Sequence, residues 1–336
     1  MLDETSATST QALLQLSAGF IPARAVYVAA KLCIADLLVE GPMDARDLAD
    51  RVGADPDALF RVLRLLAAVG VLKQCQSGRF TLTELGHALR RDSPESIRDY
   101  VLLWHESFYP IYTNIMHRMC GGSAQLSTFG KSAFEMVRSD PGFAEIFYNG
   151  LANRARIDIA ALMDALDFSQ TRVVADIGGG NGGLLFAILS RYERLSGILF
   201  DIPPAIALAE ANAALLSHRC EFIVGDFFKA VPAGADLYLL KLVLHDWGDD
   251  DALRILARCR DAMMPDSRLL VIEGLIGAPN ALTQTMLTDL NMMLGADTGR
   301  ERTEAEFATL FERTGFKLRR TIATRSALYI LEAVPV

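Results

Sequence analysis

The second half of the chain alternates short apolar runs with longer segments whose apolar residues recur every three or four positions. The apolar runs begin at residues 173, 197, 221, 237 and 269. Strands that alternate with helices in this way predict a parallel sheet with helices on both faces. Two later apolar runs, residues 316–322 and 326–332, predict an antiparallel hairpin at the edge of that sheet.

The first half has a mainly helical pattern. Residues 10–38 carry apolar side chains at spacings of three and four, with an interruption near Pro22. Helical patterns over 45–52 and 57–69 precede a short β-hairpin over 71–82. This order of elements predicts a winged helix.

A winged helix suggests a ligand-sensing, DNA-binding regulator as one hypothesis, and the charge pattern opposes it. Residues 42–98 carry nine Lys or Arg and eight Asp or Glu, a balance of +1. The second winged-helix helix has only Arg61 and Arg64 as basic residues, whereas a DNA reader presents a basic face to phosphates. The net charge of −8 for the whole chain also disfavours polyanions. We therefore expect no nucleic-acid partner.

A glycine-rich turn follows the first strand of the second half. Gly178, Gly180 and Gly183 fit the pattern G-x-G-x-x-G directly before a helical segment. Glycine at a strand-to-helix turn lets the backbone approach a ligand where a Cβ would collide. The turn therefore predicts a nucleotide-type cofactor, and the motif by itself also fits a nicotinamide dehydrogenase.

Acidic residues at successive strand ends narrow the cofactor. Asp176, Asp201 and Asp226 close three neighbouring strands. Such a cleft suits a pyrophosphate poorly, because phosphates require donors and positive charge, and it suits the cationic, phosphate-free S-adenosylmethionine. Asp201, about twenty residues after the glycines, is placed to accept the ribose hydroxyls. Asp226 and the neighbouring Phe227 are placed to hold an adenine.

Three further segments carry a family resemblance. Leu244-His245-Asp246-Trp247 follows the fourth strand, Glu273 ends the fifth, and Gly299-Arg300-Glu301-Arg302-Thr303 comes later. With the glycine turn, these resemble the small-molecule O-methyltransferases of the caffeate and hydroxyindole type, with bacterial phenazine and polyketide relatives. The resemblance covers nearly the whole chain. It implies an α/β fold: a Rossmann-like methyltransferase domain with an N-terminal α-helical, winged-helix dimerisation domain.

The resemblance also implies roles for individual residues. His245 would be the general base that takes a proton from the acceptor hydroxyl, a role that suits an unperturbed pKa of about 6.5. Glu273 and Glu301 would support it, although the charged neighbours of Glu301 are also typical of a solvated cluster. The acids at 249–251 are interpreted only as the cap of a helix over 252–263. The residues implied to bind S-adenosylmethionine are Gly178, Gly180, Asp201, Asp226, Phe227 and Lys241.

The resemblance assigns residues 1–98 to dimerisation, 99–168 to a helical linker that contributes to the acceptor pocket, and 169–336 to catalysis. The linker is rich in aromatic residues, which favours a flat, largely apolar acceptor. The residues expected to contact that aromatic small molecule are Trp104, Phe147, Leu151, Asn291 and Met292. Apolar residues of the N-terminal helices are expected to pair two copies of the chain as a homodimer.

Composition bounds the remaining possibilities. No uninterrupted apolar run approaches the roughly 20 residues that span a bilayer, and the N-terminus lacks a signal-peptide pattern. Five scattered cysteines form no C-x-x-C pair. We expect a cytoplasmic protein with no membrane partner and no metal.

Two alternatives remain within and beside the family. The same fold can methylate nitrogen or carbon, or carry out another reaction on a similar acceptor, and His245 favours oxygen because a neutral ring nitrogen does not need a base. The acidic strand ends and the His-Asp-Trp element oppose a dehydrogenase.

Overall fold

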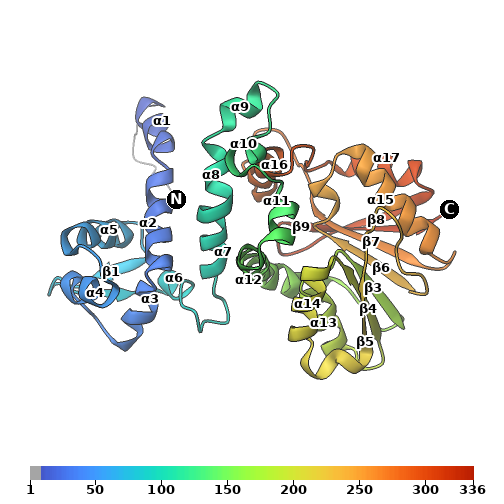
Figure 1. The fold of residues 1–336 in the computed structure, drawn as a ribbon, viewed down its shortest axis with the longest axis horizontal. Helices are drawn as coiled ribbons and strands as arrows, with labels where there is room; N and C mark the ends of the chain where they lie inside the picture. Colours follow the sequence, from blue (N-terminus) through green and yellow to red (C-terminus); the bar gives the residue numbers. More distant parts are fainter. Residues whose placement is uncertain (1–8) are drawn as a thin grey trace. The chain divides into compact units, whose positions relative to one another are not determined.

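The computed structural model describes residues 9–336, which divide into two compact units. The first unit extends to Glu106 and the second runs from Ser107 to Val336 (Figure 1). The second unit contains the predicted sheet, and each unit is described separately below.

The N-terminal unit is a small helical domain with a two-stranded wing. Its helices are α1 (Ser9–Ser17), α2 (Phe20–Lys31), α3 (Ile34–Leu37), α4 (Ala45–Val52), α5 (Pro56–Ala68), α6 (Glu84–His87) and α7 (Arg98–Leu103). The antiparallel wing consists of β1 (Leu72–Gln74) and β2 (Phe80–Leu82). Asp44 and Asp55 cap α4 and α5 by accepting hydrogen bonds from the first-turn amides. The predicted winged-helix order of elements is confirmed.

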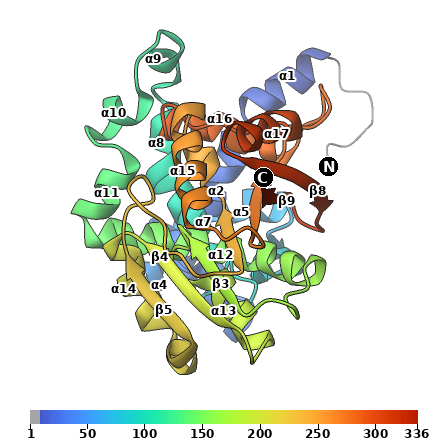
Figure 2. The same cartoon turned by 90° about the vertical axis from the view of Figure 1, so that its right-hand side faces the viewer.

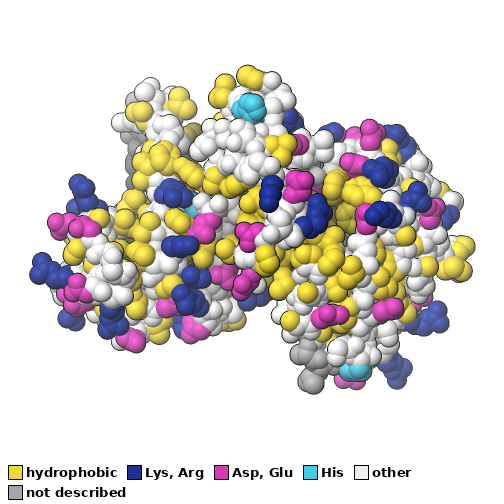
Figure 3. Space-filling view, viewed as in Figure 1, with side chains coloured by type: hydrophobic (Ala, Val, Ile, Leu, Met, Phe, Trp, Pro, Cys, Tyr) yellow, Lys and Arg dark blue, Asp and Glu magenta, His cyan; other side chains and the backbone are white. Residues whose placement is uncertain are grey.

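The first two helices leave apolar side chains at the surface. Leu13, Leu14 and Leu16 are each more than 60% exposed, and Phe20 and Ile21 about half. Figure 3 shows hydrophobic side chains on this part of the surface, fewer over α1 than over α2. The stretch Ser9–Lys31 is long and apolar enough to cross a membrane by length and composition alone. Because this stretch includes polar residues, it contains no uninterrupted apolar run of the length that spans a bilayer. The absence of a membrane partner stays a prediction.

The second unit is built on a seven-stranded mixed sheet. The strands are β3 (Val173–Ile177), β4 (Ser196–Asp201), β5 (Cys220–Val224), β6 (Leu237–Lys241), β7 (Arg268–Gly274), β8 (Phe316–Ala323) and β9 (Leu328–Pro335). Their order is β5-β4-β3-β6-β7-β9-β8, with the first five parallel and the last two antiparallel. The parallel sheet and the antiparallel edge hairpin are both as predicted.

Helices cover both faces of this sheet (Figures 1 and 2). One face packs against α12 (Pro141–Ala165), α13 (Gly183–Arg191) and α14 (Pro203–Asn212). The other packs against α15 (Asp249–Ala262) and α17 (Glu304–Arg313). The strands between the layers are almost fully buried, which explains their continuous apolar sequence.

Further helices complete the second unit beside this sheet. They are α8 (Tyr109–Tyr112), α9 (Ile115–Met119), α10 (Ala124–Phe129), α11 (Ala133–Ser139) and α16 (Gln284–Gly295). A small apolar cluster of Ile111, Ala124 and Leu294 joins α8, α10 and α16. Because the five central strands are parallel, their carboxyl ends meet at one edge of the sheet, where ligands of such folds bind.

Candidate active site

The predicted base lies on a tight turn directly after strand β6. The chain leaves β6 at Lys241, passes through Leu242 in the left-handed region (φ 53°), and forms a short 3-10 turn over Leu244–Asp246. His245 is on that turn and is 7% exposed. The turn therefore places a buried imidazole at the carboxyl edge of the sheet.

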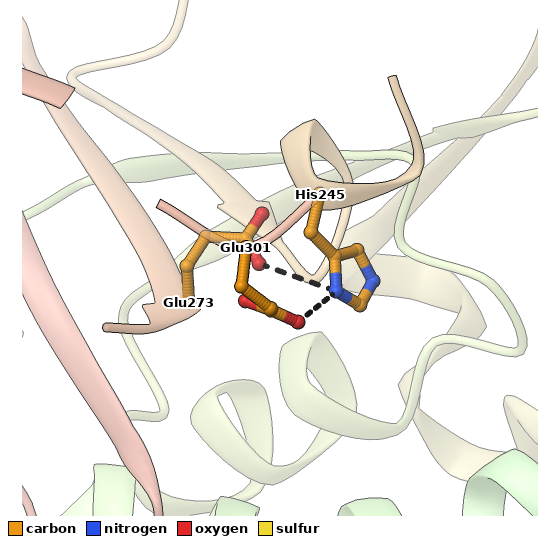
Figure 4. Close-up of side chains that lie close together, drawn as sticks. All are labelled: His245, Glu273 and Glu301. Atoms are coloured by element: carbon orange, nitrogen blue, oxygen red, sulfur yellow. Dashed lines mark hydrogen bonds and ion pairs between the residues drawn. The ribbon is translucent and has the colours of Figure 1, made fainter. Parts of the chain in front are cut away.

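Both predicted glutamates lie beside this imidazole, on the side of Nδ1 (Figure 4). Glu301 Oε1 is 2.8 Å from His245 Nδ1, a hydrogen bond between residues 56 apart in sequence. Glu273 Oε2 is 3.9 Å from the same nitrogen. His245 Nε2 lies 3.7 Å from Asp246 Oδ1, beyond hydrogen-bond distance.

The two glutamates hold different parts of the site. Glu273 Oε1 accepts hydrogen bonds from the backbone amides of Val243 (3.1 Å) and Leu244 (2.9 Å). Glu273 thus fixes the backbone of the turn, while Glu301 fixes the ring. Glu301 is itself held by its amide, which donates to Asp289 on α16. Glu301 is 4% exposed, so this residue is not part of a solvated charge cluster, although its neighbours Arg300 and Glu304 are exposed.

Burial and charge act against each other on the pKa of His245. Burial disfavours the imidazolium form, but the carboxylates of Glu273, Asp246 and Glu301 outweigh burial and raise the pKa to about 10. Burial in turn raises the pKa of Glu273 to about 7, and the His245 charge partly offsets this. The cluster therefore favours the proton on the imidazole.

The same three side chains are of types that ligate metals, and one ligand atom from each lies within 4.8 Å of the others. In this structure Nδ1 of His245 and Oε1 of Glu301 bond to each other, and Oε1 of Glu273 is taken by two amides. The prediction of no metal stays a prediction.

The glycine turn leaves open space at its centre. Gly178, Gly180 and Gly182 all have positive φ angles of 60° to 81°, which glycine adopts without strain. A Cβ on Gly178 would lie 2.9 Å from Val243 Cγ2, whereas one on Gly180 would meet nothing within 4 Å. The turn thus packs against the His245 loop at Gly178 and is open at Gly180.

Asp201 lies directly across from this turn. Its Oδ2 accepts a hydrogen bond from the Gly180 amide (2.8 Å) and its Oδ1 accepts one from the Ile202 amide (2.6 Å). Burial raises the pKa of Asp201, and these two bonds oppose the rise. The carboxylate thus holds the glycine turn and still has lone pairs for a ligand hydroxyl.

The remaining predicted cofactor residues surround the same edge. Asp226 is part-exposed and accepts from the Phe228 amide (2.9 Å). Phe227 lies within 3.7 Å of the position of a Gly178 Cβ and packs edge-on against Trp247. Burial raises the pKa of Asp176 to about 7, and the charge of Lys241 partly offsets this rise. The second unit therefore brings the predicted cofactor residues to one edge of the sheet.

The residues expected to contact the acceptor are distributed over both units. Asn291 and Met292 lie on α16, and Asn291 is 4% exposed with its Oδ1 unpartnered among the described residues. Phe147 and Leu151 lie on α12, where Phe147 contacts Phe143. Trp104 belongs to the N-terminal unit, in a π-helical turn.

Sequence reasoning did not assign Tyr148 to the cofactor side. Burial raises the pKa of the Tyr148 phenol, and the charge of Asp201 raises it further. Tyr148 and Ile159 are eleven residues, about three helical turns, apart, so they share a face of α12. Ile159 Cδ1 lies 3.4 Å from the position of a Cβ on Gly183. This face of α12 therefore lies along the glycine turn. The helical period of the sequence indicates that Tyr148 and Ile159 share a face.

Residues 113–317 match the O-methyltransferase domain family, and residues 14–92 match the O-methyltransferase dimerisation domain. The chain belongs to the O-methyltransferase family. The predicted fold class and the resemblance are thereby confirmed.

Individual members of the family match over nearly full length. The chain is 38% identical over 332 residues to the phenazine O-methyltransferase PhzM of Lysobacter antibioticus, covering 96% of each chain. It is 30% identical to a phenazine-1-carboxylate N-methyltransferase of Pseudomonas aeruginosa, again covering 96% of each. Its structure is similar to human N-acetylserotonin methyltransferase in complex with S-adenosylmethionine, at a TM-score of 0.92, 27% identity and 99% coverage of both chains.

Proposed function

We propose that this chain is an S-adenosylmethionine-dependent O-methyltransferase that acts on a hydroxyl of an aromatic small molecule in specialised metabolism. The hydrogen bond between His245 Nδ1 and Glu301 carries the proposal. In the neutral form of the ring, with Nδ1–H donated to the carboxylate, Nε2 has a free lone pair that can accept a hydroxyl proton. Specialised metabolism is inferred from relatives such as the phenazine O-methyltransferase.

The residues at the glycine turn fit S-adenosylmethionine. The open space above Gly180 accommodates backbone approach, Asp201 is placed for the ribose hydroxyls, and Asp226 with Phe227 for the adenine. Lys241 and Asp176 provide charges for the amino-acid end. When bound, the cofactor supplies an electrophilic methyl group on a sulfonium sulfur.

The residues of the chain then have separate tasks. His245 Nε2 accepts the hydroxyl proton, which leaves the acceptor oxygen with the electron pair that bonds to the methyl carbon. Glu301 and Glu273 stabilise the imidazolium that forms, because both carboxylates lie on its Nδ1 side. The hydroxyl proton ends on His245, and no covalent enzyme intermediate is required.

The acceptor pocket is assigned to α12 and α16 in the second unit. Phe147, Leu151 and Met292 offer apolar contact for a planar ring, and flexible methionines adapt well to such ligands. The unpartnered oxygen of buried Asn291 is available to a polar substituent of that ring. This supports residues 99–168 as part of the acceptor pocket and 169–336 as the catalytic domain.

The direct test of the proposed function uses S-adenosylmethionine that carries a deuterated methyl group. We expect a labelled product from a panel of phenols, hydroxyphenazines and aromatic polyketides, and fragmentation in a mass spectrometer locates the label on oxygen. A label on a ring nitrogen would favour N-methylation, which the similarity to a phenazine N-methyltransferase makes the second candidate. Absence of binding of the cofactor itself would contradict the proposal.

The pH dependence of the reaction follows from the raised pKa of His245. The base must be unprotonated to act, and the charges of Glu273, Asp246 and Glu301 outweigh burial and raise its pKa to about 10. We expect kcat/KM to rise by up to about tenfold per pH unit through the neutral range. Glu301→Gln removes a negative charge that raises the pKa of His245, so this pKa should fall. The rise of kcat/KM with pH should therefore occur at lower pH in the variant than in the wild type. Coincident limbs would contradict the role of Glu301.

The dimerisation domain implies a homodimer, and we propose that α1 and the start of α2 form its contact. Deletion of residues 1–23 removes Leu13, Leu14 and Leu16 and ends before Ala25, the first core residue of α2. We expect monomer or aggregate by light scattering coupled to gel filtration. A clean dimer of the truncated protein would contradict this interface.

A further inference from the structure

Arg302 is fully buried next to the turn that carries the proposed base. Its guanidinium donates to the carbonyl oxygens of Leu244 (Nη1, 2.9 Å) and Trp247 (Nη2, 2.8 Å). These carbonyls lie on either side of His245 and Asp246. Nε and Nη2 also donate to Asp249 Oδ1, at 3.0 and 2.8 Å.

Burial of a guanidinium is costly unless every donor group finds a partner. Asp249, at the first position of α15, supplies the counter-charge. The N-cap of that helix is Gly248, so the interpretation of Asp249 as a capping residue is corrected: it lies in the first turn and pairs with Arg302. A planar fork reaches two carbonyls and a carboxylate at once, which the single ammonium of lysine does not.

Other groups hold the same turn from a second side. Glu273 accepts from the amides of Val243 and Leu244, and the Arg300 amide donates to the His245 carbonyl (2.8 Å). Gly299 allows this close approach, because a Cβ there would lie 2.9 Å from the His245 oxygen. Amides of the turn are therefore held by Glu273, and carbonyls of the turn are held by Arg302 and by the Arg300 amide.

The turn also carries Trp247, which faces the adenine side of the site. Its indole packs edge-on against Phe227 and Phe228, at ring-centroid distances of 6.1 and 4.7 Å. Phe134 of α11 stacks on it at 5.6 Å, with 3° between the ring planes. Arg302 thus holds the backbone of Leu244 and also that of Trp247. The Trp247 indole in turn packs against Phe227, which is proposed to contact the adenine.

We propose that Arg302 is a positioning residue that holds His245 and Trp247 in one fixed turn, and so sets both the placement of the base and the affinity for the cofactor. This rests on the proposed function. It predicts a signature that loss of the base alone does not give: kcat falls and the dissociation constant for S-adenosylmethionine rises together.

The test compares Arg302→Lys, Arg302→Met and Asp249→Asn in the full-length protein. We expect Arg302→Met to lower kcat by about 10²-fold, the loss typical of a misplaced catalytic group, and to weaken cofactor binding measured by calorimetry. Arg302→Lys and Asp249→Asn should change both quantities in the same direction by smaller factors.

Asp249→Asn tests the proposal even if the Arg302 variants fail to fold, since Asp249 is half-exposed and keeps an acceptor oxygen as asparagine. Arg258→Ala is the matched control, because Arg258 forms an exposed pair with Asp261 on the same helix; its kcat and cofactor affinity should equal those of the wild type. Unchanged kcat or unchanged cofactor affinity in folded Arg302→Lys and Asp249→Asn would overturn the proposal. Failure of the wild type to transfer a methyl group would instead contradict the proposed function.

Discussion

Substitution of His245 by alanine is expected to lower kcat by roughly 10²–10⁴-fold, the usual contribution of a general base. The phenolic proton then has no acceptor at the position of Nε2, and the acceptor oxygen attacks with its proton still bound. Affinity for S-adenosylmethionine should stay close to that of the wild type, because the cofactor contacts are assigned to the glycine turn, Asp201, Asp226, Phe227 and Lys241. Single-turnover transfer of the labelled methyl group and calorimetry of cofactor binding measure the two quantities separately.

His245→Gln is a useful companion, because it keeps a polar side chain that can bond to Glu301 but has no titratable nitrogen. It should be as inactive as the alanine variant and at least as stable, since the glutamine amide can still donate a hydrogen bond to Glu301, whereas alanine offers no donor. Full activity in either variant would remove His245 from the reaction. A loss of cofactor binding equal to the loss of rate would indicate a structural role for the whole turn.

Substitution of Asp201 by alanine should act in the opposite way, weakening S-adenosylmethionine binding by about 10- to 150-fold. Hydrogen bonds to a charged group contribute about 1.5–3 kcal/mol, and each 1.4 kcal/mol changes the dissociation constant about tenfold. Two effects add at this site, because Asp201 faces the ribose and also accepts from the Gly180 amide. Its loss therefore removes a ligand contact and loosens the glycine turn.

Asp201→Asn separates these effects, since the amide oxygen can still accept from one backbone amide. Its affinity should lie between those of the wild type and Asp201→Ala. Asp226→Ala should cost less than Asp201→Ala, because the Asp226 side chain is 42% exposed and pairs with Lys229. An unchanged dissociation constant in Asp201→Ala would contradict the ribose assignment.

The sheet and the cofactor edge were predictable from local sequence. Strands buried on both faces have continuous apolar sequences, and the parallel order follows from alternation with helices. Acids at the ends of parallel strands necessarily meet at one edge, which is how Asp201 and Asp226 were assigned. The glycine turn is predicted by its G-x-G-x-x-G spacing, and the positive φ angles at Gly178 and Gly180 explain why glycine stands at these two positions.

The surroundings of His245 were less predictable. The sequence around Glu301 has the composition of a surface segment, with Arg300, Arg302 and Glu304 adjacent, yet Glu301 and Arg302 are buried. The difference between the two glutamates, one on the backbone and one on the ring, depends on contacts between segments about 30 and 56 residues apart. No local pattern encodes such distances.

The sequence by itself therefore determined the α/β fold and the cofactor edge through short-range periodicity and glycine spacing, and its motifs carried the resemblance that implied the family and the proposed base. The tertiary structure decided which charges surround that base. It raised the pKa of His245 through buried carboxylates, buried Arg302 against two carbonyls of the turn, and placed Tyr148 near Asp201. Electrostatic effects of this size require low solvent exposure. Whether a charged residue is buried depends on how the whole chain packs, and not on the residues next to it in sequence.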